Sequence, residues 1–244
     1  MATVEAHYQD VLSEIYSWMS GGFDVQLAKN RSFFKTHNMQ PKGSNLAIDL
    51  GAGCGFQSIP LAEMGYSVTA IDLSDNLLKE LKANDTTGTI TIKRNDINNF
   101  DRYVAAPSGL IVCMTDTLLH IESKGKVKEL FKKAMDHLEH SGRFVITFRD
   151  LFNPLEDLDR FIPVRQDENT ILTCFLEYEL DTVKVHDLIY SLTNGHWKMK
   201  KSFYRKLRLS ADWVKDQLVQ VGFSEVILDV GSGLVTIVAM KSNV

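Results

Sequence analysis

The sequence lacks a long apolar run and has only three cysteines among its 244 residues. A membrane-spanning helix needs about 20 consecutive apolar residues, so we expect no association with a membrane. Cys54, Cys113 and Cys174 are far apart and lack the spacing of a metal site. We therefore expect no bound metal, no disulfide and a reducing, cytoplasmic setting. The N-terminal Met-Ala-Thr-Val-Glu-Ala-His also differs from a signal peptide.

An excess of basic residues is absent as well. Lysine and arginine number 27 against 31 acidic residues, which gives a net charge of −4. Nucleic-acid binders gain much of their affinity by neutralising phosphates, so this balance disfavours nucleic acid as a partner. Hydrophobic residues make up 44% and charged residues 24%, as in an ordinary globular protein of one large or two small domains.

One segment has the pattern of strand, glycine-rich turn, helix and second strand. The apolar strand at 46–50 carries one acid, Asp49. Three glycines then stand at alternate positions: Gly51, Gly53 and Gly55. Such glycines permit positive φ and leave bare backbone against which a ligand can lie. A helix at 56–64 follows, and the next strand, 68–71, ends at Asp72.

Two kinds of ligand suit this unit. A dinucleotide fold requires Gly-x-Gly-x-x-Gly, but Phe56 stands at the third glycine position, which disfavours a nicotinamide oxidoreductase. A glycine-rich turn without a ligand would explain the glycines alone. The pattern Asp-x-Gly-x-Gly-x-Gly at 49–55, followed by Asp72, resembles motif I of the class I S-adenosylmethionine-dependent methyltransferases.

This resemblance implies S-adenosylmethionine as the cofactor and S-adenosylhomocysteine as its product. The first acid would lie near the methionyl ammonium, the glycines under methionine and ribose, and Asp72 on the two ribose hydroxyls. After the next strand, Asp96 would bond the adenine amino group and Ile97 would pack on the ring, although an Asn-Asp turn explains these residue types equally well. The implied cofactor-binding residues are Asp49, Gly51, Ala52, Gly53, Gly55, Asp72, Leu73, Asp96, Ile97 and Met114.

The expected fold is one doubly wound α/β domain, Rossmann-like, spanning 1–244. By resemblance it has seven mostly parallel strands, the last antiparallel, with helices on both faces. The cofactor-binding core is 46–150, in which a helix at 124–139 is expected to end at Gly142. Alternating residues predict an antiparallel β excursion at 161–209 that covers the substrate.

Residues 1–45 are expected to form a helical leader with helices at 4–19 and 25–36. In small-molecule methyltransferases a leader often closes over the cofactor as a lid, and this makes Tyr16 a candidate substrate contact. For Tyr8 and Trp18 we favour simple packing of the leader onto the domain.

The acceptor side is expected after the fourth and fifth strands, because ligands of open α/β sheets lie outside the carboxyl ends of the strands. The segments 113–121 and 146–150 resemble those of glycine N-methyltransferases, which implies that Arg149 holds a substrate carboxylate and that Asp116 faces the amine. Asp116 replaces an asparagine of that family and would attract a cation. For His120 we favour a structural contact at a helix start.

One basic cluster, Lys198, Lys200, Lys201, Arg205, Lys206 and Arg208, lies in alternating strand. We interpret it as a solvated outer face. The sequence thus predicts a methyltransferase for a small molecule with an amine or a carboxylate, with no catalytic base identified. An RNA or protein methyltransferase and a non-catalytic cofactor-binding module are the alternatives.

Overall fold

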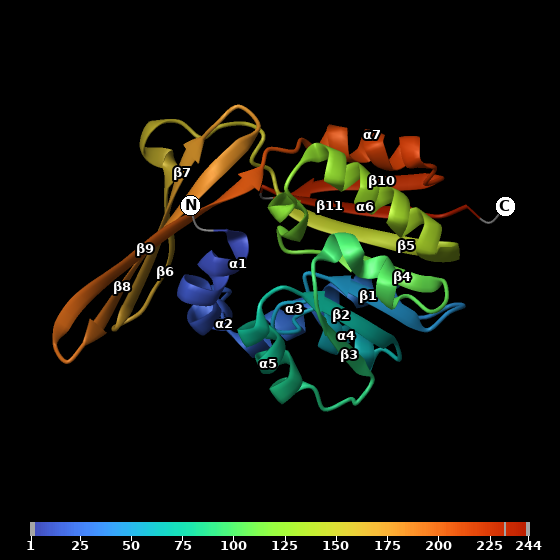
Figure 1. The fold of residues 1–244 in the computed structure, drawn as a ribbon, viewed down its shortest axis with the longest axis horizontal. Coiled ribbons are helices and arrows are strands. Elements are labelled where there is room, and N and C mark those ends of the chain that lie inside the picture. Colours follow the sequence, from blue (N-terminus) through green and yellow to red (C-terminus); the bar gives the residue numbers. More distant parts are fainter. Residues whose placement is uncertain (1–2, 232, 243–244) are drawn as a thin grey trace.

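The computed structural model describes residues 3–231 and 233–242, and two β-sheets dominate its ribbon (Figure 1). The larger sheet has the strand order β10-β11-β5-β4-β1-β2-β3. Its strands are β1 (Leu46–Leu50), β2 (Ser67–Asp72), β3 (Ile90–Arg94), β4 (Ser108–Cys113), β5 (Leu138–Arg149), β10 (Glu225–Gly231) and β11 (Leu234–Met240). The strands β3, β2, β1, β4 and β5 pair in parallel. β11 pairs antiparallel with β5, and β10 pairs antiparallel with β11. The predicted seven-stranded sheet is therefore confirmed.

Helices cover both faces of this sheet, as predicted. Successive strand residues point to opposite faces, so Leu110 packs with α3 and α4 on one side while Ile111 packs with α6 and α7 on the other. The helices are α3 (Phe23–Thr36), α4 (Ser58–Glu63), α5 (Asp75–Asn84), α6 (Lys124–His137) and α7 (Ala211–Val221). Serine side chains cap α5, α6 and α7 at their N-termini.

The prediction that Gly142 ends a helix is wrong. Helix α6 ends at His137, and Gly142 lies inside β5. A Cβ at Gly142 would lie 2.9 Å from the carbonyl oxygen of Glu139 and 3.1 Å from that of Ser108. Gly142 therefore allows two backbone segments to approach closely within the sheet and does not end a helix.

The leader is helical but irregular. The single helix expected at 4–19 is divided into α1 (Val4–His7), a π-helical turn η1 (Tyr8–Leu12), a 3₁₀ turn η2 (Ser13–Ile15) and α2 (Tyr16–Met19). The backbone leaves helical geometry at Ile15, with φ −114° and ψ 5°. These breaks turn one set of leader side chains toward the second sheet and another toward the glycine turn.

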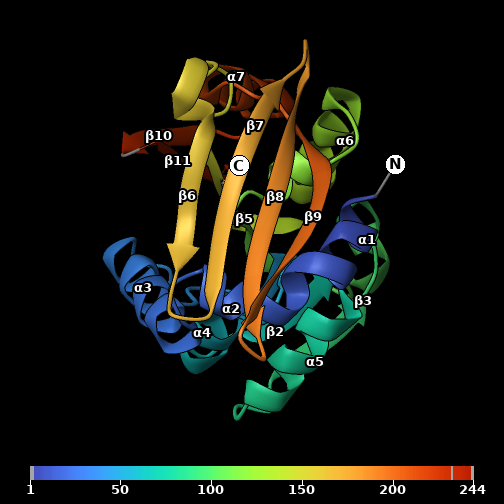
Figure 2. The ribbon, with the colours of Figure 1, turned by 90° about the vertical axis from the view of Figure 1, so that its left-hand side faces the viewer.

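The second sheet, here called the excursion sheet, contains four antiparallel strands where the sequence indicated three alternating runs. They are β6 (Phe161–Gln166), β7 (Thr170–Tyr178), β8 (Thr182–Thr193) and β9 (His196–Leu207). The leader lies between this sheet and the larger one (Figures 1 and 2). Its buried inner face includes Val183, Val185, Asp187 and Ile189 of β8. Leu180 is 90% exposed because it follows the end of β7.

In the part of the chain that the structure describes, no helix is long and apolar enough to cross a membrane.

Candidate active site

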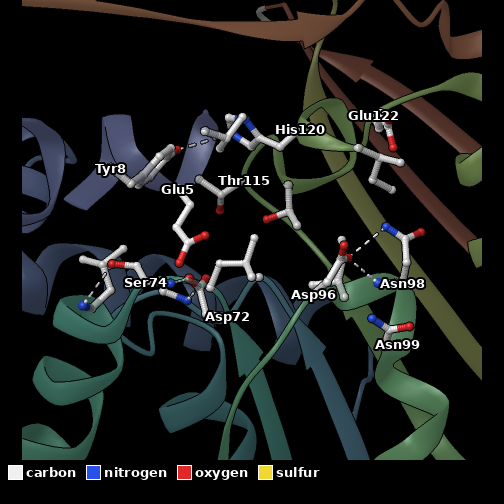
Figure 3. A pocket seen from close by; sticks show the side chains of 18 of the residues that line it. Glu5, Tyr8, Asp72, Ser74, Asp96, Asn98, Asn99, Thr115, His120 and Glu122 are labelled. Atoms are coloured by element: carbon white, nitrogen blue, oxygen red, sulfur yellow. Dashed lines mark hydrogen bonds between the residues drawn. The ribbon is translucent and has the colours of Figure 1, made fainter. Parts of the chain in front are cut away.

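A cavity of about 410 Å³ lies at the carboxyl ends of the parallel strands (Figure 3). The glycine turn after β1, the end of β2, the start of the 3₁₀ helix η3 (Ile97–Tyr103) and the loop after β4 form its walls. The leader contributes a further wall. The predicted site residues that line it are Tyr16, Gly51, Gly53, Asp72, Leu73, Asp96 and Ile97.

The glycine turn adopts the conformation that its sequence predicts. Gly51, Gly53 and Gly55 have φ values of 79°, 51° and 97°, which side chains rarely tolerate. A Cβ at Gly51 would lie 2.3 Å from the hydroxyl oxygen of Thr117, whereas one at Gly53 would meet nothing closer than Tyr16, at 3.8 Å. Gly53 therefore presents bare backbone to the cavity.

Gly51→Ala is expected to cost more stability than Gly65→Ala. Both positions have positive φ, but a Cβ at Gly65 has no atom within 4 Å. The strained φ alone costs about 1–2 kcal/mol, and Gly51→Ala adds the collision with Thr117 at the cavity wall. We expect both variants to melt below wild type, Gly51→Ala by the larger amount, and weaker cofactor binding for Gly51→Ala only. Equal melting of the two variants with intact binding would contradict the assignment of this turn.

Asp72 stabilises the glycine turn from the end of β2. One carboxylate oxygen accepts the backbone N–H of Gly53 at 2.9 Å, and the other accepts that of Ser74 at 2.7 Å. Burial raises the pKa of Asp72 above its ordinary value, although these backbone donors oppose the shift. Ser74, not Asp72, caps α5. Asp72 lines the cavity and keeps lone pairs for a ligand.

Asp96 stands on the far side of the cavity, at the N-terminus of η3 (Figure 3). Its Oδ1 accepts the backbone N–H of Asn98 at 2.8 Å and the side-chain N–H of the same residue at 3.0 Å. Asp96 therefore both forms the Asn-Asp turn and lies in the cavity wall. The turn does not exclude a contact between Asp96 and a ligand.

Four predicted cofactor residues are not among those that line the cavity. Ala52, Gly55 and Met114 pack in the interior. Asp49 is 1% exposed, and its Oδ2 accepts the hydroxyl of Ser58 at 2.6 Å, which joins β1 to the first residue of α4. Burial raises the pKa of Asp49 to about 7.

On the acceptor side Asp116 is paired within the chain. Its Oδ2 lies 2.6 Å from the ammonium of Lys206, its Oδ1 accepts the backbone N–H of Arg149 at 2.7 Å, and the Arg149 guanidinium lies 3.5 Å away. Burial, the largest single influence, would raise the pKa of Asp116, but the charges of Lys206 and Arg149 and the hydrogen bonds from both residues together hold that pKa well below its usual range. Lys206 is buried, so its assignment to a solvated outer face is wrong.

His120 and Tyr8 both line the cavity, although the sequence predicted only structural contacts for them. His120 ends the 3₁₀ helix η4 (Thr117–His120) and lines the cavity, so the expected contact at a helix start is wrong. The Tyr8 hydroxyl lies 3.3 Å from its Nε2, and its Nδ1 is buried without a hydrogen-bond partner (Figure 3). Burial and then the Lys206 charge lower the pKa of His120 to about 3. The imidazole is therefore neutral at physiological pH.

The leader contacts the rest of the site through aromatic rings. Tyr16 stacks on Phe56 with centroids 5.8 Å apart, and Tyr8 lies 6.0 Å from Tyr16. Trp18 packs against the excursion sheet, where the Arg165 guanidinium covers its ring. Packing is thus confirmed for Trp18, while Tyr8 also borders the cavity.

Two non-glycine residues after β4 also have left-handed backbone. Thr115 and Asp116 have φ values of 56° and 68°. The Thr115 N–H donates to the Thr147 hydroxyl at 2.9 Å, and the Asp116 N–H donates to the Thr147 carbonyl oxygen at 3.2 Å. Strained backbone of this kind often occurs at functional sites. No sequence signal marked Thr115, which lines the cavity.

Comparisons with known proteins agree with this geometry. Residues 47–142 match a family model described as a methyltransferase domain. A methyltransferase of Geobacillus sp. (strain WCH70) is 22% identical over 75% of each chain. The glycine/sarcosine N-methyltransferase of Aphanothece halophytica is 23% identical over 48% of this chain and 44% of its own.

A solved structure shares the whole fold. The amino pentose methyltransferase CalS10 of Micromonospora echinaspora, determined with bound S-adenosylmethionine, has a TM-score of 0.74 and 13% identity. The match covers 94% of this chain and 96% of CalS10. At this identity the likeness establishes a common fold, and it includes the excursion sheet as well as the core.

Proposed function

We propose that this chain, a class I S-adenosylmethionine-dependent methyltransferase, methylates the nitrogen of a small amine acceptor. The observation that carries the proposal is the imidazole of His120 in the cavity wall, whose Nδ1 has no hydrogen-bond partner. A nitrogen must present a lone pair to be methylated, so the acceptor has to be an uncharged amine at the moment of transfer. A neutral imidazole can accept one N–H of such an amine.

The cavity suits the cofactor on three grounds. Its volume of about 410 Å³ is within the usual range for small ligands. Gly53 leaves room for a ligand against its backbone, and the Asp72 carboxylate has free lone pairs beside it. We assign Asp72 and Leu73 to the ribose, and Asp96 and Ile97 to adenine. Asp49, Gly51, Ala52, Gly55 and Met114 act in this proposal by shaping the turn and the strand ends.

The cofactor supplies a methyl group on a positively charged sulfur that needs no further activation. The task of the chain is to hold the acceptor nitrogen in line with that methyl. In the tautomer whose Nε2–H donates to the Tyr8 hydroxyl, Nδ1 of His120 keeps the lone pair, and a bound amine would have to reach this buried, unpartnered nitrogen to donate its N–H. That hydrogen bond would direct the amine lone pair to the methyl. Transfer of the methyl to the amine lone pair would leave the electron pair of the broken S–C bond on the cofactor, so no residue has to supply a base for that step, and the product ammonium would lose its proton to water.

The acceptor is small because two covers close over the strand ends. The leader, 1–45, acts as a lid that brings Tyr16 to the site, and the excursion at 161–209 forms the outer cover of the core, 46–150. Arg149, with its side chain 68% exposed, is the candidate for an anionic group of the acceptor. Asp116 positions that arginine and Lys206, so it does not bind the amine directly. The names of the glycine/sarcosine and amino pentose enzymes support an amine acceptor.

His120→Asn is expected to lower kcat by about a hundredfold, the usual effect of a misplaced reacting group. Purified enzyme would be assayed with S-adenosylmethionine against a panel of small amines, alcohols and carboxylic acids. We expect turnover with amines only, and retained cofactor affinity in His120→Asn. The matched control is His140→Asn, an exposed histidine bonded to the Ser242 carbonyl oxygen. Turnover of alcohols, or an unchanged kcat in His120→Asn, would reject the proposal.

The pH profile provides a separate test. Because the pKa of His120 is about 3, its protonation does not limit activity between pH 5 and 9. The acid limb of kcat/KM should instead follow the acceptor ammonium, with a tenfold fall per pH unit below its pKa. Two acceptors with different amine pKa values should therefore give acid limbs displaced by that difference. A common limb near pH 6.5 for both would identify an ordinary histidine.

A further inference from the structure

The cavity wall beside the glycine turn contains a hydroxyl group whose proton has no acceptor. The Thr115 hydroxyl oxygen accepts a side-chain N–H of Gln57 at 3.1 Å, and Thr115 lines the cavity. The backbone N–H of Thr115 donates to the Thr147 hydroxyl at 2.9 Å. In the part of the chain that the structure describes, no group accepts the proton of the Thr115 hydroxyl. This proton is therefore available to a bound ligand.

Gln57 orients this hydroxyl from behind the cavity wall. It is 5% exposed and is not among the residues that line the cavity. Its side-chain nitrogen lies 3.4 Å from Oδ1 of Asn30, whose own side-chain nitrogen donates to the carbonyl oxygen of Gln26 at 2.9 Å. Because the Asn30 nitrogen is used in this way, Gln57 has to present its two N–H groups to Asn30 and Thr115. The direction of the Gln57 amide is thus fixed by its neighbours.

The backbone at Thr115 is strained for this type of residue. Its φ is 56°, and a β-branched side chain rarely adopts left-handed backbone. Such residues persist only where the surrounding structure over-determines them, and they gather at ligand-binding sites. Gln57 constrains the side chain of Thr115, and Thr147 constrains its backbone. The strain therefore indicates that the position of this hydroxyl serves a bound ligand.

The position of Thr115 corresponds to the methionyl end of the cofactor. The placement proposed above assigns adenine to Asp96 and ribose to Asp72, which leaves the methionyl arm for the end of the cavity beyond Asp72. Gln57 comes two residues after Gly55, so its bond to Thr115 places the hydroxyl beside the glycine turn. In Figure 3 Thr115 stands across the cavity from Asp96.

The methionyl arm has a carboxylate that is ionised at neutral pH, and the cavity offers it little positive charge. Among the lining residues within 3–231 and 233–242, no arginine occurs and Lys126 is the one lysine. The hydrogen bond to Glu129 raises the pKa of Lys126, and the charges of Glu122 and Asp96 raise it further, so Lys126 belongs to the adenine end. A carboxylate at the other end therefore requires neutral donors such as hydroxyl groups.

We propose that Thr115 donates its hydroxyl proton to the methionyl carboxylate of the cofactor and that Gln57 is the positioning residue that orients this hydroxyl. The proposal rests on the cofactor placement of the proposed function and is independent of the amine acceptor. Tyr16 and Thr117 also bring hydroxyls to the cavity, but neither hydroxyl has a hydrogen-bond partner among the residues that the structure describes. The Thr115 hydroxyl is therefore the one oriented in advance, which lowers the entropic cost of binding.

Two ligands separate the methionyl arm from the rest of the cofactor. S-adenosylhomocysteine contains the arm with its carboxylate, whereas methylthioadenosine keeps adenine, ribose and sulfur but lacks the amino acid group. Both would be titrated by calorimetry into wild type, Thr115→Ser and Thr115→Ala. The two variants lose the methyl branch of threonine and differ from each other only in the hydroxyl. Thr115→Ala is expected to bind S-adenosylhomocysteine at least about tenfold more weakly than Thr115→Ser, as a lost hydrogen bond to a charged group implies. The two variants should bind methylthioadenosine equally.

Gln57→Leu tests the positioning role. It is expected to weaken S-adenosylhomocysteine binding by about fivefold in the wild-type background, since the hydroxyl is kept but no longer oriented. In the Thr115→Ala background it should have no further effect, because the group that it orients is gone. Methylthioadenosine binding should stay unchanged throughout. Gln217→Leu, which replaces a buried glutamine of α7 that is 8% exposed, is the matched control and should change neither affinity.

Three results would overturn the proposal. One is equal binding of S-adenosylhomocysteine by Thr115→Ser and Thr115→Ala. Another is a loss in Thr115→Ala that is the same for both ligands, since Thr115 would then only shape the cavity. The third is an additive effect of Gln57→Leu and Thr115→Ala. Asp72→Ala, titrated in parallel, should weaken both ligands; if it weakens neither, the cofactor placement itself is wrong, and the proposal fails with it.

Discussion

Asp72→Ala is expected to weaken S-adenosylmethionine binding by about a hundredfold. Its carboxylate would accept both ribose hydroxyls, and hydrogen bonds to a charged group contribute about 1.5–3 kcal/mol each. Two such bonds total at least about 3 kcal/mol, and about 1.4 kcal/mol corresponds to a factor of ten in affinity. Asp72→Asn keeps the shape and one acceptor oxygen, so its affinity should lie between those of the two other proteins. Titration of the three proteins with the cofactor measures the effect.

The structural role of Asp72 has to be separated from its role in binding. The carboxylate also holds the N–H groups of Gly53 and Ser74, so both variants should melt below wild type without cofactor. Asp75→Ala is the matched control, because Asp75 is an acid in the first turn of α5 whose partner is Lys79. It should change neither property by much. An affinity within twofold of wild type in folded Asp72→Ala would remove Asp72 from the cofactor site.

Lys206→Met is expected to cost about 3–5 kcal/mol of folding free energy, the usual result of breaking a buried ion pair. The side chains of Lys206 and Asp116 are each about 7% exposed in the wild type. Methionine fills a space similar to that of lysine, but the buried Asp116 carboxylate then loses its nearest cation. Arg149, at 3.5 Å and largely exposed, replaces only part of this attraction. Chemical denaturation at neutral pH measures the loss.

The direction in which the unfolding free energy of Lys206→Met changes with pH shows whether the unpaired Asp116 carboxylate causes the loss. In the wild type the lowered pKa of Asp116 stabilises the fold above the ordinary carboxyl pKa, and this contribution disappears as pH falls through the folded value. In Lys206→Met the pKa of Asp116 should rise, so the variant should approach wild-type stability as the pH falls and Asp116 takes up a proton. Lys206→Met combined with Asp116→Asn should recover most of the loss at neutral pH. Lys200→Met, an exposed neighbour, is the control; a similar effect there would reject the role of the pair.

The glycine turn could be predicted from sequence because its determinants are local. Glycines at 51, 53 and 55 are needed where φ is positive, and the apolar runs beside them form β1 and β2 as expected. Asp72 follows from its place at the end of β2. These features depend on residues within about one βαβ unit, so a linear pattern contains them.

Lys206 could have been found from alternation. In a strand, neighbours such as Arg205 and Lys206 point to opposite faces, so they cannot both belong to one solvated face. Its partner Asp116, however, is 90 residues away in the sequence. The pairing of β9 with β8 and the docking of that sheet over the loop after β4 decide the contact, and no local pattern contains either.

The role of Tyr8 and His120 was hidden for the same reason. Tyr8 and His120 are 112 residues apart, and only the irregular path of the leader brings them to 3.3 Å. Helical periodicity predicted the stripe of leader residues but not the π-helical and 3₁₀ turns that bend it. These turns depend on packing against two sheets, which overrides the propensity of the segment.

The most direct test of the central claim is the destination of the methyl group. Purified enzyme and methyl-labelled S-adenosylmethionine would be incubated with a cell extract that is then separated into small molecules, RNA and protein. We expect the label in a small amine, with one S-adenosylhomocysteine formed per methyl transferred and transfer by His120→Asn slower by about a hundredfold. Label in the RNA or protein fraction, or cofactor binding without transfer to any fraction, would contradict the account.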